Sequence, residues 1–386
     1  MMIKSAEGRL RMEKYIRITA WLLMLGLCTA ISGCSFSKDL NDATEYLKRQ
    51  EAMLSEDTGW IETPYKLGLA LTEETYYAQD GGKKSECRGV FRVFDFSSDT
   101  HDDREISWEN GMSIFPRNEG SGLAILKPGS KNDMLYEVTE DFSIGRKKSV
   151  KLKDVWTVYA LVDENIYYQA DEGDEAFYGG DFFTVRHNLK TGKIEKLGID
   201  DFHCVDGDDN LIGKRWREVE RLAKDGKTTI AESIYEIGVL NAENKWTGIA
   251  EEGWECAFDA IESACWLDEN SILIAMSPSD AHETFLYRYD LRSGACEQLA
   301  SESGKPISLY KAEYMDRVMY PDPSGEYIAY FVMDWSAIGT IESWDSVYVL
   351  SLKTGQISCV EKDETHTEDE AAEMYKFLCT DMLIWM

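Results

Sequence analysis

Residue types and motifs that support many kinds of catalysis are scarce in this chain of 386 residues. Only five histidines could serve as bases near neutral pH, and there is no Gly-x-Ser-x-Gly elbow for a nucleophilic serine. No Cys-x-x-Cys pair indicates a zinc module, and neither Gly-x-Gly-x-x-Gly nor a P-loop sequence indicates a nucleotide site. We therefore expect neither a metal nor a cofactor.

Positive charge is also in short supply. The chain has 41 lysines and arginines against 71 aspartates and glutamates, which gives a net charge of -30. Residues 1–33 hold five of the cations and two of the anions, so the remainder carries about -33. Such a surface repels phosphate backbones, and we expect no nucleic-acid partner.

The nine cysteines are spaced irregularly and outline no disulfide framework. Two of them, Cys256 and Cys265, are a candidate hairpin disulfide, which spacing alone leaves open because geometry decides such a bond. Most of the cysteines beyond residue 34 lie beside aromatic or β-branched residues and are expected to be small buried apolar groups. They are Cys87, Cys204, Cys256, Cys265, Cys296, Cys359 and Cys379.

The N-terminal segment has the charge order of a secretory signal. Lys14 and Arg17 precede a short apolar run over residues 18–31, which is too short for a comfortable membrane span. The run ends in four residues that resemble the lipobox of bacterial lipoproteins, Ile31, Ser32, Gly33 and Cys34. The resemblance implies that Cys34 receives the lipid and that a signal peptidase recognises the three residues before it.

Three regions follow from this reading. Residues 1–33 are the expected lipoprotein signal peptide, with Met12 as an alternative start, and residues 34–59 are the lipidated cysteine and a short tether. Residues 60–386 are the expected folded domain. The protein is thus expected to be extracytoplasmic and held at the membrane by its N-terminal lipid.

From Trp60 onward, short runs of β-branched and aromatic residues alternate with turn residues, which is typical of an all-β protein. One turn sequence recurs: an Asp, Asn or Ser that can accept from the following N–H groups, then Ser or Thr, then a glycine that tolerates positive φ. Its copies begin at Asp95, Asp141, Asn188, Asn241, Asp290 and Ser351, of which Asp95 lacks the glycine and Asn241 is degenerate.

The repeat spacing identifies the architecture. Successive copies lie roughly fifty residues apart, and one hairpin signature per such period predicts the four-stranded blades of a β-propeller. We predict six blades, with seven as the alternative count. The apolar segment at residues 377–385 is expected to pair with the first blade and close the ring.

Two stretches resemble the repeats of TolB-like propellers. Asp322-Pro323-Ser324-Gly325 precedes the strand-like residues 326–330, and the sequence from Tyr287 to Gly294 is similar to the outer hairpin of such repeats. The resemblance covers residues 65 to about 360 and implies architecture, with no catalytic residues carried over.

Few residues stand out as chemistry on this frame. The acidic stretch Asp206–Asn210 lacks the spacing of a calcium-binding loop and is expected to be a turn, and His187 is expected to fill a core position. Ten tryptophans follow residue 34, and most of the aromatic side chains are expected to lie between blades.

The predicted function is binding. A propeller on a tether is expected to hold an envelope protein, peptide or glycan through loops at one face, without catalysis. The alternative is an envelope glycan hydrolase or lyase that uses carboxylates in the propeller channel, because a pair of acids suffices for such chemistry. A purely structural spacer is a third reading.

Overall fold

The computed structural model describes residues 61–79, 82–98, 100–106, 112–117, 122–139, 144–171, 182–222, 227–253, 256–278, 284–309, 319–334, 344–362 and 374–385. In these ranges the secondary structure consists of 25 β-strands and no helix. Accordingly, none of the described segments is a helix that could cross a membrane.

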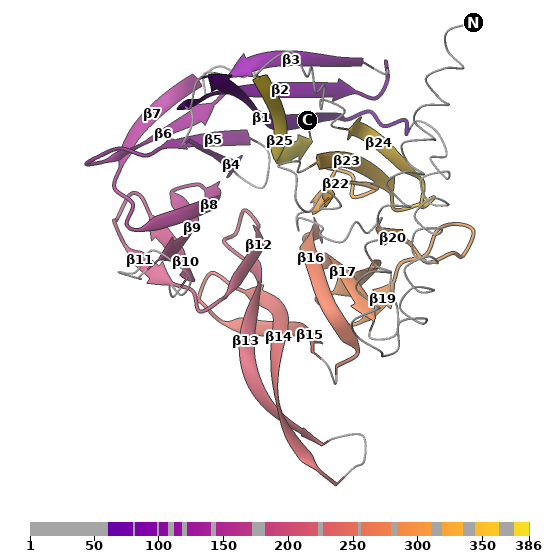
Figure 1. The fold of residues 1–386 in the computed structure, drawn as a ribbon. Helices are drawn as coiled ribbons and strands as arrows, with labels where there is room; N and C mark the ends of the chain where they lie inside the picture. Colours follow the sequence, from indigo (N-terminus) through magenta and orange to yellow (C-terminus); the bar gives the residue numbers. More distant parts are fainter. Residues whose placement is uncertain are drawn as a thin grey trace, which may run out of the picture. The chain divides into compact units, whose positions relative to one another are not determined.

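Twenty-four of the strands form six blades of four strands, arranged around a centre in Figure 1. Blade 1 contains β25 (Met374–Trp385), β1 (Lys66–Gln79), β2 (Gly82–Asp95) and β3 (Thr100–Ile106). Blade 2 contains β4 (Ser113–Arg117), β5 (Gly122–Lys127), β6 (Asp133–Val138) and β7 (Ile144–Val150). Blade 3 contains β8 (Val155–Val162), β9 (Asn165–Asp171), β10 (Phe182–Asn188) and β11 (Ile194–Lys196).

The second half of the ring repeats the pattern. Blade 4 contains β12 (Asp201–Val205), β13 (Leu211–Leu222), β14 (Thr229–Leu240) and β15 (Trp246–Glu252). Blade 5 contains β16 (Phe258–Asp268), β17 (Ser271–Pro278), β18 (Thr284–Asp290) and β19 (Cys296–Gln298), with the short β20 (Ser308–Leu309) against β18. Blade 6 contains β21 (Met319–Pro321), β22 (Tyr327–Asp334), β23 (Trp344–Ser351) and β24 (Ile357–Lys362).

Single parallel pairs connect some of the blades. Arg117 of β4 pairs with Leu161 of β8, and Glu252 of β15 pairs with Phe258 of β16. Apart from these two points, the ladders described are antiparallel and run within one blade. The six four-stranded blades predicted from the turn spacing are thereby confirmed.

Six apolar clusters fill the spaces between successive blades, one cluster for each boundary. Strand β17 shows why the blades pack on both sides. Ile272 and Ile274 contact blade 4, whereas the alternating Leu273 and Ala275 contact blade 6. A continuous apolar run is what a strand needs when both faces of its sheet are covered.

The C-terminal strand completes blade 1. Strand β25 pairs with β1 along its length, from Trp385 opposite Leu67 to Met374 opposite Tyr77. Leu383 and Trp385 also lie in the cluster that joins blade 1 to blade 6. The segment at residues 377–385 is therefore the strand at which the two ends of the domain meet, and the ring has no open boundary between the first and last blades.

The recurring turn joins the third and fourth strands of each blade. In blade 5, Asp290 Oδ1 accepts hydrogen bonds from the N–H groups of Arg292 (3.1 Å) and Ser293 (2.7 Å), and Gly294 has a φ of 69°. Asn188 does the same in blade 3. The copy at Asp141 falls between β6 and β7 but lies outside the described residues.

This turn geometry gives a direct test. Replacement of Gly294 by valine is expected to lower the free energy of unfolding by about 1 kcal/mol or more, because a β-branched residue is strained at positive φ. Gly122→Val in β5 is the control, since its φ is not positive and the nearest atom to an added Cβ is Arg117 Cβ at 4.0 Å. Urea unfolding of both variants measures the difference, and equal losses would contradict the argument.

Candidate functional site

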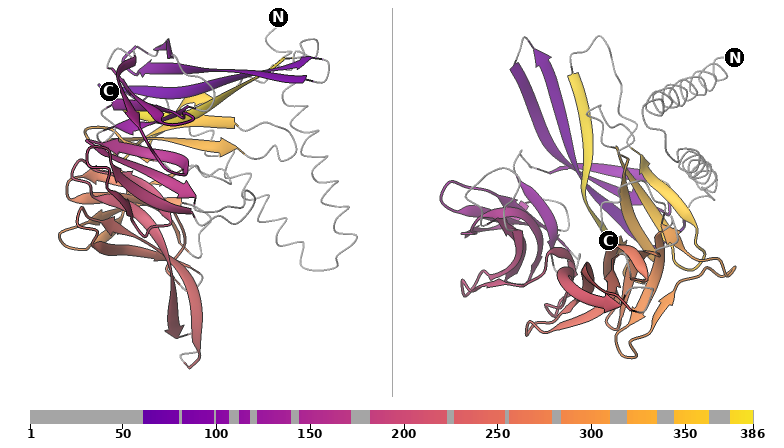
Figure 2. Two further views of the ribbon diagram at one scale, coloured as in Figure 1. Left: turned by 90° about the vertical axis from the view of Figure 1, so that its left-hand side faces the viewer. Right: turned by 60° about the horizontal axis from the view of Figure 1, so that its bottom comes forward.

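The longest hairpin of blade 4 projects beyond the other strands (Figures 1 and 2). Strands β13 and β14 pair from Leu211 opposite Leu240 to Leu222 opposite Thr229. The neighbouring β12 pairs with β13 only as far as Lys214, and β15 pairs with β14 only as far as Tyr235. Among the described strands, β13 from Arg215 to Leu222 pairs only with β14, and β14 from Thr229 to Ile234 pairs only with β13. We call residues 215–222 and 229–236 the ribbon below.

One face of the ribbon carries an ion-pair ladder. Arg215 donates to Glu236 Oε2 at 2.8 Å, and Arg217 and Arg221 both pair with Glu251 of β15. Glu236 also accepts from the indole N–H of Trp246 at 2.7 Å. A two-stranded ribbon is marginally stable by itself, and the contacts with Glu251 and Trp246 fix it to β15, the fourth strand of the blade.

The opposite face is aromatic and exposed. Trp216 and Tyr235 lie directly opposite each other across the two strands, with 47% and 40% of their surfaces exposed, and Leu222 near the tip is 66% exposed. Lys214 is buried beneath them, where it pairs with Glu252 at 3.2 Å. We call this the aromatic face. It comprises Trp216, Glu218, Glu220, Leu222, Thr229, Ala231, Ser233 and Tyr235.

Sequence reasoning assigned most aromatic side chains to the spaces between blades and so missed this pair. A signal was present in the chain. From Lys214 to Leu222, charged residues occupy both alternating sets of positions, so neither face of that strand can be entirely a core face. A second exposed aromatic pair, Trp156 and Phe182 of blade 3, has ring centroids 5.4 Å apart in an edge-to-face arrangement.

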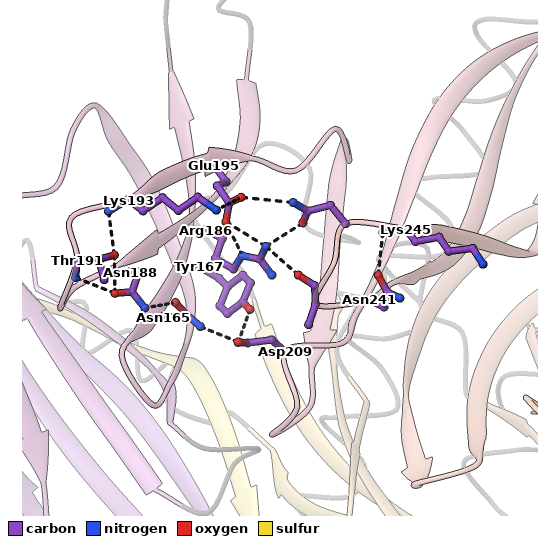
Figure 3. A network of polar contacts seen from close by, with 12 residues as sticks. Asn165, Tyr167, Arg186, Asn188, Thr191, Lys193, Glu195, Asp209, Asn241 and Lys245 are labelled. Carbon is purple, nitrogen blue, oxygen red and sulfur yellow. Dashed lines mark hydrogen bonds and ion pairs between the residues drawn. The ribbon is translucent and has the colours of Figure 1, made fainter.

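A polar network joins blade 3 to blade 4 (Figure 3). It lies at the ends of β13 and β14 that are opposite to the ribbon. Arg186 of β10 is 8% exposed and donates to Glu195 Oε2 at 3.1 Å and to Asn244 Oδ1 at 2.9 Å. Tyr167 and Asn165 both donate to the carboxylate of Asp209, each at 2.7 Å. Burial and the Asp209 carboxylate raise the pKa of Tyr167 far above its ordinary value.

The groups of this network satisfy one another across the blade boundary. Arg186 has carboxylate, amide and carbonyl acceptors from two blades, which are the partners a buried guanidinium requires. We therefore assign the network to structure, and the ribbon is the candidate functional site.

The stretch Asp206–Asn210 is the turn between β12 and β13, as predicted. Asp206 Oδ1 accepts from the backbone N–H groups of Asp208 (2.9 Å) and Asn210 (2.8 Å), while Asp209 contributes to the network described above. The described residues include no group of three or more His, Cys, Asp or Glu side chains placed to hold a metal ion.

The histidines of the described segments, His101, His187 and His203, lie on three different strands. His187 of β10 and His203 of β12 are buried at 7% and 5% exposure, and burial lowers the pKa of His187. His101 of β3 is exposed and lies near the ring of Phe94 at 5.5 Å between centroids. The expectation that His187 fills a core position is confirmed.

Five carboxyl groups in the described part of the chain have clearly displaced pKa values. Wherever a carboxyl pKa in the described part of the chain is clearly displaced, it is displaced downward, by hydrogen bonds or by neighbouring cations that more than offset burial. A general acid in a channel requires the opposite displacement. The five such groups are Asp95, Glu164, Glu195, Asp268 and Asp290.

The cysteines that the structure describes are free thiols. Cys256 and Cys265, the candidate hairpin pair, are both buried and unbonded, so that disulfide is absent. Burial raises the pKa of Cys265 in β16 and of Cys204 in β12. The Cys204 thiol is also close enough to raise the pKa of Cys265 further. Ile31, Ser32, Gly33 and Cys34 lie outside the described residues, and the lipid attachment there stays a prediction.

A pH effect is expected from the recurring turn. Hydrogen bonds from Ser293 hold the pKa of Asp290 below its ordinary value. The unfolded chain therefore binds a proton more readily, so stability from this group is present above about pH 4 and is lost as the pH falls through the folded pKa. Asp290→Asn keeps an acceptor without titrating, as Asn188 does in blade 3. The difference in unfolding free energy between wild type and variant should shrink from about pH 5 to about pH 2; a constant difference would contradict this.

These features define a class, the six-bladed β-propellers whose C-terminal strand completes the first blade. Several solved structures resemble the chain at low sequence identity. Putative TolB from Agrobacterium tumefaciens has a TM-score of 0.45 and 9% identity, with 81% of this chain and 98% of that one covered. TolB from Acinetobacter baumannii has a TM-score of 0.37 and 11% identity, with coverages of 75% and 68%.

A third similar structure is the β-propeller domain of the Trilobed protease from Pyrococcus furiosus. Its TM-score is 0.36 at 11% identity, and the match covers 77% of this chain and 98% of that domain. No protein-family model and no curated protein matches the sequence. The chain is thus similar in fold to TolB and to other β-propellers.

Proposed function

We propose that this protein is a lipid-anchored, extracytoplasmic binding module without catalytic activity, and that the aromatic face of the ribbon holds a protein or peptide partner. The exposed cross-strand pair of Trp216 and Tyr235 is the observation that carries the proposal. Aromatic residues dominate the energy of protein interfaces, because each covers a large area and has few rotatable bonds to immobilise.

The support beneath the aromatic pair favours binding. The ladder of Arg215, Arg217 and Arg221 against Glu236 and Glu251 holds the opposite face of the same ribbon. A side chain presented on a fixed strand loses less conformational freedom when a partner binds than one on a loop, so more of its contact energy appears as affinity.

The ribbon is tested by paired alanine variants of the full-length protein. Trp216→Ala combined with Tyr235→Ala should weaken capture of the partner from envelope membranes by about tenfold or more, because removal of a central aromatic anchor typically costs at least about 2 kcal/mol. Trp156→Ala is the matched control, since Trp156 is 68% exposed but lies on β8 of the neighbouring blade. An equal loss in the control, or no loss in the ribbon variant, would remove the ribbon from the proposed site.

The anchor is tested separately. Cys34→Ala should abolish metabolic labelling with radioactive fatty acid and leave uncleaved precursor, because the thiol is the acceptor of the lipid. Cys28→Ala, within the apolar run, is the control and should be labelled normally. Persistent labelling of the Cys34 variant would overturn the anchoring proposal while leaving the ribbon untouched.

A further inference from the structure

The ribbon has a free backbone edge on β13. Lys214 is the last residue of β13 that pairs with β12, and its carbonyl accepts from the N–H of Asp200 at 2.8 Å. The N–H of Trp216 then donates to the carboxylate of Asp200. Beyond this point no described strand pairs with that edge. Since outward-pointing backbone groups recur at every second residue, those of Glu218, Glu220 and Leu222 point away from β14.

The side chains along this edge have one sign of charge. Glu218 and Glu220 belong to the aromatic face and are exposed, and neither has an ion-pair partner within the part of the chain that the structure describes. The arginines of the ribbon on this strand, Arg215, Arg217 and Arg221, belong to the opposite face and are engaged with Glu236 and Glu251. Lys214, next to the ribbon, is buried and pairs with Glu252.

The second edge of the ribbon lacks this charge. Along β14, the corresponding side chains of the aromatic face are those of Thr229, Ala231 and Ser233, which are uncharged. A charged partner segment would therefore distinguish between the two edges, and complementarity selects the edge of β13 for a basic one.

We propose that the edge of β13 from Glu218 to Leu222 receives an extended basic segment of the partner as an added antiparallel strand. This inference rests on the proposed function and specifies its chemistry. Lysine or arginine side chains of the segment lie opposite Glu218 and Glu220, on the aromatic face. Strand addition supplies affinity through main-chain hydrogen bonds and specificity through alternate side chains.

A second copy of this chain is a poor occupant of the same edge. Two β13 edges in antiparallel contact would place glutamates of one copy against glutamates of the other, and like charges directly opposite each other are destabilising. The net charge of -30 on each copy adds to this repulsion. The exposed edge is in this way closed to self-association and open to a basic strand.

The geometry makes a specific demand on the incoming backbone. In an antiparallel pair, residues that exchange both hydrogen bonds lie directly opposite and have their side chains on the same face. Because Glu218 and Glu220 point their N–H and C=O groups outward, the basic residues opposite them must point their own N–H groups toward β13. The intervening residues of the segment point theirs away.

This demand is tested with a nine-residue peptide that alternates lysine and valine, added to the full-length protein in non-ionic detergent at low salt. Methylation of the backbone nitrogens of the lysine residues should weaken binding by about tenfold or more, because it removes the N–H groups that donate to β13. N-methylation of the valine residues should change the Kd less than about threefold. Equal effects of the two methylations, or no binding of the parent peptide, would overturn strand addition.

Charge reversal supplies a second measurement. Because it predicts that the variant gains binding of an acidic peptide, a misfolded variant cannot give the expected result. The double variant Glu218→Lys with Glu220→Lys should bind the parent peptide about tenfold or more weakly. A peptide with glutamate in place of lysine should bind this variant instead. Glu243→Lys with Glu297→Lys changes the net charge equally at exposed sites off the ribbon and should have less than about a threefold effect. An equal effect of the two double variants would overturn the assignment to β13.

The outcomes separate this inference from the proposed function. If Trp216→Ala with Tyr235→Ala abolishes capture of the partner while both methylated peptides bind alike, the aromatic face binds its partner without strand addition. If sedimentation shows a dimer at micromolar concentration that the Glu218→Lys and Glu220→Lys changes alter, the edge is occupied by a second copy and the basic-strand proposal fails.

Discussion

Removal of β25 by ending the chain at residue 373 is expected to leave the protein without a cooperative unfolding transition. Strand β25 pairs with β1 over most of its length, and its last three residues before Met386 are buried side chains, Leu383, Ile384 and Trp385. Burial of one large apolar side chain stabilises by about 1.5–3 kcal/mol, so three of them approach the 5–15 kcal/mol that typically separates folded from unfolded proteins.

The expected loss of stability is larger than the burial of these three side chains alone would give, because β25 also joins blades 1 and 6. Trp385 donates its indole N–H to the carbonyl of Tyr320 in blade 6 at 2.8 Å and stacks on Phe96 beyond β2, with 5.8 Å between ring centroids. Its absence would expose one edge of β1 and open the ring between blades 1 and 6.

The measurements are far-UV circular dichroism through a thermal scan, and limited proteolysis. Trp385→Ala in the full chain is the milder version and should cost about 3–5 kcal/mol, in the range of a buried aromatic replaced by alanine. Removal of Met386 alone is the control and should change little. A protease-resistant core with a sharp transition in the chain that ends at residue 373 would show that blade 1 is stable with three strands.

The architecture was predictable because its signals are local and repeated. Asp290 and Asn188 accept from the next N–H groups in their own turns, and this chemistry is set by neighbouring residues of the chain. The spacing of these turns predicted six blades, and the apolar residues at 377–385 predicted the segment that pairs with β1. Neither inference required knowledge of which distant side chains meet.

The degenerate turn at Asn241 shows what local signals leave out. Asn244 takes the left-handed conformation, with a φ of 63°, that Gly192, Gly294 and Gly355 have in the turns of blades 3, 5 and 6. Its side chain then accepts from Arg186 in the neighbouring blade at 2.9 Å. From the sequence, the missing glycine looked like decay of the repeat, because the reason for asparagine lies some sixty residues away in another blade.

The ribbon escaped sequence reasoning for a related reason. Alternating apolar and polar residues identify the buried face of a strand, but Trp216 alternates with charged residues on both sides. Its exposure follows from the length of β13 and β14, which continue beyond the ends of β12 and β15. Strand length relative to neighbours is a tertiary property, and residue pattern alone does not give it.

Replacement of Arg186 by alanine is expected to lower the free energy of unfolding by about 3 kcal/mol, the lower part of the range for breaking a buried ion pair. The guanidinium side chain is 9% exposed, and it bridges Glu195 of its own blade to the turn at Asn244 of blade 4. Its removal leaves Glu195 paired with the exposed Lys193 and leaves the Asn244 amide oxygen and the Ala242 carbonyl without this donor.

Two variants distinguish this network from an ordinary ion pair. Arg186→Lys should recover little of the loss, because a single ammonium cannot reach both blades with the planar set of donors of a guanidinium. Arg288→Ala is the matched control. Its pair with Asp268 at 3.0 Å is about half exposed on both sides, and such surface pairs contribute less than about 1 kcal/mol.

The bridging role itself is measured by a double-mutant cycle with Asn244→Gly, which introduces the residue that the turns of blades 3, 5 and 6 have in this conformation and tolerates the positive φ. By itself this change should cost about 1 kcal/mol, the net value of one hydrogen bond to a charged donor less the gain from relieved backbone strain. With Arg186 already absent, the same change should cost nothing or stabilise slightly. Full additivity of the two changes would show that the guanidinium and the amide act independently.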